Sequence, residues 1–372
     1  MKRHLTLVLS GFLLVGCRDA NVAGPAPAVS VQPRLATQLS TPSARRVTVM
    51  TRNMYIGADV DAVIGALASP DPGDDLPALL GAIAVLQRTD FPARVEALAD
   101  EIARARPHVV GLQEVDSLGI HLAALGLPID IEQEFLSALQ AALAARGLDY
   151  AVAGLVVNVT AAPFPGIGLR DHDVILVDAE RVTVNPAVTA QTFTFNIGPV
   201  APGVVLQRGL VMIDVTIEGT PIRIASTHLE SGGAPGLSAL RAAQAAELAS
   251  VVGAASPAIL LGDFNDTPGS TMYGVVTGAG FTDAWGALRP GALGFTCCEA
   301  ADLSNQVAGL SQRIDYVFVR GLAGSRGNVL GQVEIVGARP GDRVAGPFYP
   351  IWPSDHAGVV LDVLLPPAVA RD

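Results

Sequence analysis

Apolar and polar residues follow two different rhythms along this chain. Short apolar runs that end in polar or turn residues predict strands. These runs lie at 45–57, 108–115, 149–157, 172–178, 193–197, 258–263, 313–319, 332–337 and 357–365. Apolar residues three and four positions apart predict helices. Helical spacing covers 60–68, 76–105, 131–147 and 236–253, with a turn at 69–75. The segment 207–231 predicts a hairpin that turns at Glu218, Gly219 and Thr220.

The order of these elements predicts the fold class. Helices and strands alternate in the first half of the chain, and strand runs dominate the middle and the end. This mixture favours an α/β (α+β) fold with strands stacked in two sheets and helices outside. The chain has 372 residues and is 50% hydrophobic but only 5% aromatic. We therefore expect a sizeable core built from Ala, Val, Leu and Ile.

The first residues have the pattern of an export signal. A basic start at Met1–His4 precedes the apolar stretch Leu5–Val15, which is too short to span a bilayer. The stretch ends in Leu14–Cys17, which resembles the lipobox of bacterial lipoproteins. The resemblance implies that residues 1–16 are a signal peptide and that the sulfur of Cys17 is lipidated. An ordinary secretory signal and a start-site artefact are the alternatives.

Residues 17–45 are rich in Ala, Pro, Ser and Thr and lack a core pattern. They are typical of a flexible tether, so the folded domain is expected at 46–368. The later apolar runs are short and are broken by Gly, Pro and charge, which predicts no transmembrane helix. We expect an exported monomer that lipidated Cys17 anchors to the outer or cytoplasmic membrane of the envelope, or a secreted one. The sequence gives no sign of a protein partner.

The net charge of −11 restricts the function. The predicted domain carries no Lys/Arg run, whereas a stoichiometric nucleic-acid binder has a basic stripe. An enzyme that meets a polyanion through bound cations is still compatible with this charge.

Two adjacent cysteines, Cys297 and Cys298, are the only ones after Cys17. They cannot form an ordinary disulfide framework. Their Cα atoms are about 3.8 Å apart across a trans peptide, which is below the usual disulfide range. A vicinal disulfide, free thiols and a soft-metal pair all fit the sequence.

Polar residues that could hold a metal or a phosphate occur at the ends of several predicted strands. Each has an ordinary structural interpretation when taken singly, as a turn former, a surface acid, half of an ion pair or a satisfied histidine. Their repeated position at strand ends favours a shared site. The set comprises Asn53, Glu114, Arg170, His228, Asp263, Asn265, Asp315, Asp355 and His356.

The motifs around these residues resemble the endonuclease/exonuclease/phosphatase superfamily. That family includes pancreatic-type deoxyribonuclease, abasic-site endonucleases, bacterial sphingomyelinases and inositol polyphosphate 5-phosphatases. The resemblance covers about residues 46–366 and implies a four-layer sandwich of two packed mixed β-sheets flanked by helices. The matching motifs are Asn53-Met54, "LQE" at 112–114, "STH" at 226–228, "GDFND" at 262–266, "RIDYVF" at 313–318 and "SDH" at 354–356.

The resemblance also implies a divalent cation, Mg²⁺ or Mn²⁺, on hard oxygen ligands. Glu114 is the first expected ligand, with Asn53 and Asp355 nearby. Asp263 would position or deprotonate the attacking water. Asn265 lies two residues further on and, in an extended chain, would face the same side as Asp263.

The remaining site residues would act on the phosphate. His228 and His356 would donate to its oxygens, and Asp315 would pair with His356, fix its tautomer and raise its pKa. Arg170 would stabilise the pentacoordinate charge through its planar guanidinium, at a place where the family varies.

The resemblance favours a metal-dependent hydrolase of phosphoesters, and within that class a nuclease-like phosphodiesterase. A phospholipid or sphingomyelin-type phosphodiesterase and a small-molecule phosphatase are alternatives, as is a catalytically inactive surface binding lipoprotein. Tyr55 stands where abasic endonucleases carry an acid. Cys297 and Cys298 precede "RIDY" and would either line the site or pack in a loop.

Overall fold

The computed structural model describes residues 45–322 and 329–366. The expected signal peptide, Cys17 and all but the last residue of the expected tether lie outside these ranges. No helix among the described residues has the length and apolar character to cross a membrane.

Ten strands form the first sheet. β1 and β2 are parallel neighbours, and the other pairs are antiparallel, so the sheet is mixed. β3 (Ser117–His121) pairs with β6, and β4 (Asp130–Glu134) pairs with β3. The main order is β15 (Gly331–Val336), β18 (Gly358–Leu364), β1 (Arg46–Asn53), β2 (Val109–Gln113), β6 (Ile167–Asp178), β5 (Tyr150–Ala161), β9 (Val204–Leu206) and β8 (Gly198–Ala201).

Six strands form the second sheet, which is also mixed because β11 and β12 are parallel. A separate two-stranded ribbon joins β16 (Val344–Ala345) to β17 (Pro350–Ile351). The order in the second sheet is β13 (Thr282–Asp283), β14 (Asp315–Arg320), β12 (Ala258–Asp263), β11 (Thr220–His228), β10 (Gly209–Ile217) and β7 (Val182–Thr192).

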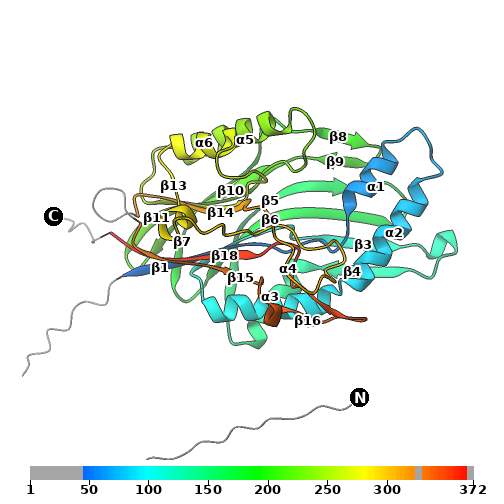
Figure 1. The fold of residues 1–372 in the computed structure, drawn as a ribbon, viewed down its shortest axis with the longest axis horizontal. Helices are drawn as coiled ribbons and strands as arrows, with labels where there is room; N and C mark the ends of the chain where they lie inside the picture. Colours follow the sequence, from blue (N-terminus) through cyan, green and yellow to red (C-terminus); the bar gives the residue numbers. More distant parts are fainter. Residues whose placement is uncertain (1–44, 323–328, 367–372) are drawn as a thin grey trace, which may run out of the picture. The chain divides into compact units, whose positions relative to one another are not determined.

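Helices cover the outer faces of both sheets (Figure 1). α3 (Phe91–Ala105) and α4 (Phe135–Ala145) pack on the first sheet, and α5 (Leu237–Val252) and α6 (Thr271–Gly278) pack on the second. The described part of the chain is therefore a four-layer sandwich of two mixed sheets flanked by helices, as expected. The remaining helices are α1 (Val60–Leu67), α2 (Asp75–Arg88), α7 (Ala284–Leu288) and the 3₁₀ turns η1 (Ala123–Leu125) and η2 (Pro340–Asp342).

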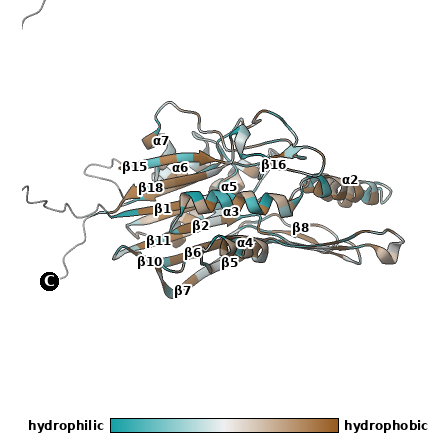
Figure 2. Ribbon diagram, turned by 90° about the horizontal axis from the view of Figure 1, so that it is seen from below, coloured by the Kyte–Doolittle hydropathy of each residue, from teal (hydrophilic) through white to brown (hydrophobic). Residues whose placement is uncertain are grey.

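The space between the sheets is filled by Val, Ile, Leu and a single Ala. Apolar and polar residues alternate along some strands, seen as bands of colour in Figure 2, whereas β2 and β12 are buried on both faces. Each fully buried Val, Leu or Ile contributes about 1.5–3 kcal/mol relative to an exposed one. The sheets approach closely at Gly111, where a Cβ would lie 2.8 Å from Ser226 Oγ and 2.9 Å from Leu261 Cβ. The expectation of an aliphatic core is confirmed between the sheets, whereas the clusters under the outer helices also contain buried Phe and Tyr.

Three predicted elements differ from the structure. The helix expected over 76–105 is two helices, because Asp90 between them has a left-handed φ of 38° and Pro92 opens the second. The helix expected from residue 131 begins at Phe135, because residues 130–134 pair with β3 as β4.

The strand expected at 193–197 is a loop between β7 and β8. Side chains there bind the backbone in place of a neighbouring strand. Thr194 N donates to Glu247 Oε2 at 2.8 Å, and Asn196 Nδ2 donates to Phe193 O at 2.8 Å. Such local bonds compete with sheet pairing, and the apolar pattern does not reveal them.

A buried ion pair links β1 to α3. Arg52 Nε lies 2.9 Å from Glu101 Oε2, and both side chains are 1% exposed. The same guanidinium donates through Nη1 to the carbonyl of His356. Helix α3 therefore supports the loop that carries the "SDH" motif.

We expect Glu101→Gln to lower the free energy of unfolding by about 3–5 kcal/mol, because Arg52 keeps its buried charge and loses its counter-ion. Urea denaturation measures this change. The matched control is Asp362→Asn, because Asp362 pairs with Arg46 at 2.8 Å with both side chains more than a third exposed. That variant should lose at most about 1 kcal/mol. Equal losses in the two variants would contradict the role assigned to Glu101.

Candidate active site

Four strands change from apolar to polar along the faces that point between the sheets. In β12, Ile259 and Leu261 belong to the core between the sheets, and Asp263 follows in the same alternation. β11 carries Ile222 and Ile224 toward that core and ends at His228 on the same parity. The same change occurs along β14, from Val319 and Val317 to Asp315, and along β1, from Val47 and Val49 to Asn53. The sheets therefore bring these polar groups together at one edge.

Neighbouring strands align three of these groups in one row. His228 stands opposite Asp263 in the β11–β12 register, and Asp263 stands opposite Asp315 in the β12–β14 register. His228 Nε2 lies 3.5 Å from Asp263 Oδ2. His356 closes the group, with Nδ1 2.9 Å from Asp315 Oδ2 and 3.8 Å from Asp263 Oδ2. All four side chains are buried.

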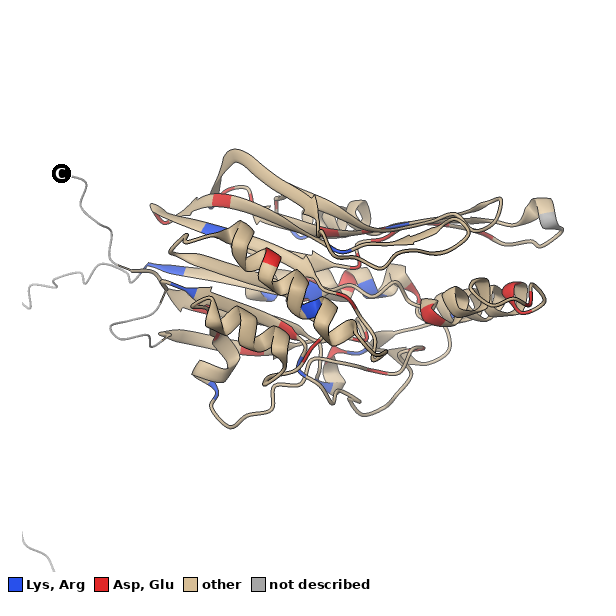
Figure 3. Ribbon diagram, turned by 90° about the horizontal axis from the view of Figure 1, so that it is seen from above, with Lys and Arg blue, Asp and Glu red and all other residues tan. Residues whose placement is uncertain are grey.

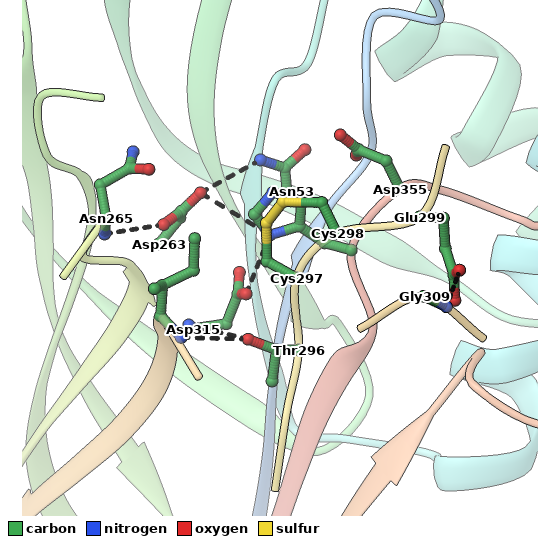
Figure 4. The surroundings of a disulfide bond; sticks show 12 residues. Asn53, Asp263, Asn265, Thr296, Cys297, Cys298, Glu299, Gly309, Asp315 and Asp355 are labelled. Carbon is green, nitrogen blue, oxygen red and sulfur yellow. Dashed lines mark hydrogen bonds and ion pairs between the residues drawn. A yellow bond between two sulfur atoms is a disulfide. The ribbon is translucent and has the colours of Figure 1, made fainter. Parts of the chain in front are cut away.

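Asp263 ends β12, and Asn265 lies in the turn that follows (Figure 4). Gly262 has a φ of 153°, and a Cβ there would lie 2.1 Å from Thr227 O, so the close approach of β11 requires glycine. Asn265 N donates to Asp263 Oδ1 at 2.9 Å, and Asn265 Nδ2 donates to Leu229 O at 2.9 Å. Asn265 lies beyond the strand with a left-handed φ of 51°, so it reaches the site through a turn and not through an extended chain.

The first sheet contributes Asn53 and Glu114. Asn53 Nδ2 donates to Glu114 Oε1 at 2.8 Å and approaches Asp263 Oδ2 at 3.4 Å. Its oxygen accepts from Tyr55 N at 2.9 Å, and Ile56 N donates to Glu114 Oε2 at 3.1 Å. In this arrangement the Asn53 amide orients the carboxylate of Glu114, and its oxygen is occupied by the backbone.

Tyr55 does not offer a free acid in place of the carboxylate of abasic endonucleases. Its hydroxyl donates to Ala301 O at 2.7 Å. Burial, together with the charges of Asp355 and Glu114, raises the pKa of Tyr55 far above its usual value. Tyr55 therefore stays neutral and packs beside the site.

A cavity of about 450 Å³ opens onto these groups, with Glu114, Asp263 and Asp355 among its lining residues. Burial, reinforced by Glu114, raises the pKa of Asp355 to about 6. Burial and the neighbouring charge of Asp315 raise the pKa of Asp263 to about 7. Negative charge is thus concentrated here with too few cations to balance it.

This charge distribution fits a divalent cation, because crowded hard carboxylates are its preferred ligands. Asp315 Oδ1 is buried without a hydrogen-bond partner among the described residues. Glu114 and Asp355 line the same cavity, and ligand atoms of Asp263, Asp315 and His356 lie within 4.8 Å of one another. The donor set supports a metal, and its identity as Mg²⁺ or Mn²⁺ stays a prediction.

The two histidines carry different charges. Burial, together with the nearby cations Arg208 and His356, lowers the pKa of His228 well below its usual value. Burial also disfavours a charged His356, but Asp315, Asp355 and Asp263 outweigh it and raise the pKa of His356. The site therefore pairs a neutral imidazole with a cationic one.

The structure places Arg170 apart from the other predicted residues. It is exposed on β6, whereas its neighbours Leu169 and Asp171 line the cavity from the opposite face of the strand. The cavity instead contains Arg208, which is 7% exposed and lies just before β10, with Nε 3.5 Å from Glu230 Oε1. Side chains alternate between the two faces of a strand, so Arg170 and Asp171 on β6 point to opposite faces. This alternation was a sequence signal against placing Arg170 in the site.

Sequence reasoning also missed a group of buried acids beside the site. Burial raises the pKa of Asp171 to about 7 and raises those of Asp116 and Asp173 well above the usual value. Both carboxylate oxygens of Asp173 and Oδ1 of Asp171 lack hydrogen-bond partners among the described residues. An alternating "LRDHD" pattern on a strand buried at its end was the available signal.

Cys297 and Cys298 are joined by a disulfide in this structure, and both line the cavity (Figure 4). The backbones of Cys297 and His356 pair in an isolated antiparallel β-bridge, and the preceding Thr296 Oγ1 accepts a hydrogen bond from Asp315 N at 3.2 Å. Of the two placements considered, the pair therefore lines the site.

Known structures share this fold. A protein from Beutenbergia cavernae described as an endonuclease/exonuclease/phosphatase matches with a TM-score of 0.57 and 21% identity, over 88% of this chain and 73% of that one. A family protein from Bacteroides thetaiotaomicron matches with a TM-score of 0.53 and 17% identity, over 89% and 99%. D. rerio TDP2 in complex with a single strand DNA product matches with a TM-score of 0.51 and 17% identity, over 86% and 98%.

No curated protein matches the sequence closely enough to count as a relative. The model of the Endonuclease/Exonuclease/phosphatase family matches residues 85–356, which is more than half of the chain. The match covers every predicted site residue except Asn53. On this match, and on the four-layer fold that agrees with it, the chain belongs to the endonuclease/exonuclease/phosphatase family.

Proposed function

We propose that this protein hydrolyses phosphodiesters with the help of a divalent cation. Membership of the family supports the wider class of phosphoester hydrolase. The observation that carries the finer proposal is the buried row of His228, Asp263 and Asp315, closed by His356. Of these, His228, Asp263 and His356 line one cavity together with Glu114 and Asp355. A surface protein that only binds ligands would have no need for so many buried, unbalanced charges.

Glu114 and Asp355 would hold the Mg²⁺ or Mn²⁺. Asn53 would orient Glu114 through its hydrogen bond to Glu114 Oε1. The cation, when bound, neutralises charge on the phosphate and on the leaving oxygen. Metal ligation by Asn53 itself would require its amide to turn over.

Asp263 is suited to act as the general base. A carboxyl group with a pKa of about 7 can accept a proton from water near neutral pH. The water oxygen bonds to phosphorus as its proton passes to Asp263, and the bond from phosphorus to the leaving oxygen breaks. The leaving oxygen takes up a proton from solvent water, so an alcohol and a phosphomonoester result. Asn265 lies beside Asp263 in the same cavity and can position the water.

His356 is suited to bind the phosphate as a cation. Its Nδ1 faces Asp315, which leaves Nε2–H for a phosphate oxygen. Neutral His228 offers a second ring nitrogen beside Asp263, and Arg208 supplies the fixed positive charge expected of Arg170. The developing negative charge therefore meets two cations.

A second set of proposals concerns location. Lipid attachment at Cys17 and export to the cell envelope, or secretion, follow from the sequence pattern alone. The nuclease, the phospholipid-type phosphodiesterase and the small-molecule phosphatase share the chemistry above, and the neighbour that holds a DNA product supports the nuclease only by its fold.

The test compares bis(4-nitrophenyl) phosphate with 4-nitrophenyl phosphate in Mg²⁺ and in EDTA. We expect faster hydrolysis of the diester, loss in EDTA, and a kcat lower by about 10²–10⁴-fold in His356→Ala, the range for a group that acts on the proton or charge of the transition state. Near-normal activity in that variant would refute its role. A preference for the monoester would indicate a phosphatase, and absence of Mg²⁺ or Mn²⁺ binding in calorimetry would indicate an inactive binding protein.

Arg208 and Arg170 form a matched pair. Arg208→Met should lower kcat/KM for the diester by at least about 10²-fold, because it removes a charge-assisted donor from a water-poor site. Arg170→Met should change it less than twofold, because that side chain is exposed on the other face of β6. A larger loss of kcat/KM in Arg170→Met than in Arg208→Met would mean that Arg170, and not Arg208, stabilises the charge on the phosphate.

Asp315→Asn should lower the pKa of His356, because it removes the carboxylate at 2.9 Å that favours the cation. Below its folded pKa, His356 is charged in the native protein, and the variant should lose that charge at a lower pH. Imidazole ¹⁵N NMR in EDTA measures the shift, and exposed His121, which pairs with Asp130, is the internal reference. An unchanged His356 titration would mean that Asp315 does not set its charge.

A further inference from the structure

The cavity does not end at the catalytic groups. It continues between α1 and α2 on one side and strands β3, β5, β6 and β9 on the other. This continuation, here called the apolar chamber, is walled by aliphatic side chains that include Ile64, Leu67, Leu86, Leu118, Leu169 and Leu206. One space therefore joins a charged end to an apolar end.

The cavity as a whole, with the chamber as its apolar end, is larger than an ordinary packing defect. The whole cavity measures about 450 Å³, within the 300–1,000 Å³ typical of ligand sites. Several wall residues, Ile64 and Leu206 among them, are neither fully buried nor part of the hydrophobic clusters of the described residues. Water gains little from such walls because it finds few polar partners there.

Charge in the cavity disfavours a second substrate phosphate. Arg208 is the one arginine among the lining residues of the described chain, and it is already paired with Glu230. Besides the groups assigned to the reaction, the lining carries the acids Asp59, Asp61 and Asp116. Figure 3 shows acidic residues on the helices at the α1–α2 end. A nucleic acid needs cations for its flanking phosphates, and beyond Arg208 and His356, which would serve the reacting phosphate, the described lining carries no arginine or lysine.

We propose that the substrate is a phosphodiester with one lipid-like apolar chain, which lies in the apolar chamber while its phosphate meets His228, Asp263 and His356. This inference rests on the proposed function and specifies its substrate class. Water adds to phosphorus and the bond to the leaving group breaks, so the apolar chain leaves on a phosphomonoester or as an alcohol. Burial of the chain orients the phosphate at the catalytic groups.

The test uses 4-nitrophenyl phosphodiesters whose second ester group is methyl, butyl or octyl, below their micellar concentrations and in Mg²⁺. The enzyme is the full chain with Cys17→Ser, so that no attached lipid competes for the chamber. Each buried methylene should raise kcat/KM by about two- to fourfold, so the octyl ester, with four more methylenes, should exceed the butyl ester by about 16- to 256-fold. Calorimetric binding of the corresponding alkyl methylphosphonates in EDTA should show the same order without catalysis.

Ile64→Asn and Leu206→Asn should each reduce the octyl-to-butyl ratio by about tenfold, because they place an amide in the path of the chain. The matched control is Leu293→Asn, which changes an exposed leucine outside the cavity and should keep the ratio.

Three outcomes separate the proposals. A methyl ester that is hydrolysed with no gain from longer chains would overturn the apolar-chain proposal and leave the phosphodiesterase intact. Plasmid nicking together with a flat chain series would assign the site to nucleic acid and overturn it equally. Failure to hydrolyse any ester in the series would instead refute the proposed function.

Discussion

Strand register is the constraint on which the site depends. Side chains alternate between the two faces of a strand, so a shift of one residue would turn Asp263 away from the first sheet. Ile259 and Leu261 prevent that shift because they are buried between the sheets, while Leu260 packs against the outer helices. The aliphatic core thus determines where the carboxylate points. The same holds for Asp315, which follows Val317 on β14.

At the edge of the sheets that carries the site, the residues buried between the sheets change from aliphatic to polar and charged. Thr51, Gln113 and Ser226 form a hydrogen-bonded layer between the aliphatic core and the charged row. Beyond it, Glu114 and Asn265 adopt left-handed backbone conformations with φ of 53° and 51°. Such conformations cost of order 1–3 kcal/mol and persist where the surrounding structure enforces them. The packed sheets supply that enforcement.

Much of this arrangement could be predicted from the sequence. The hydrophobic pattern and the turn residues predicted most strands. The polar residues at the strand ends identified His228, Asp263 and Asp315 as candidate site residues. The importance of Arg208 could not be predicted in this way, because it depends on which residues meet the cavity. The "LRDHD" alternation marked the acids near Asp171 only as one face of a strand and did not indicate that this face lies beside the cavity. The apolar chamber has the same origin, since α1 and β9 are far apart in sequence and meet only in the fold.

Two buried arginines tie the catalytic loops to helix α3. Arg52 bonds the carbonyl of His356 as well as Glu101, and Arg94 donates to Met54 O at 2.7 Å and to Pro353 O at 3.2 Å. In loops that carry binding groups, the free energy of local opening is usually only a fraction of the free energy of global unfolding. Here the loops after β1 and before β18 share their hydrogen bonds with a core helix. Slow amide exchange in these loops would then track that of α3, and the site would persist until the whole domain unfolds.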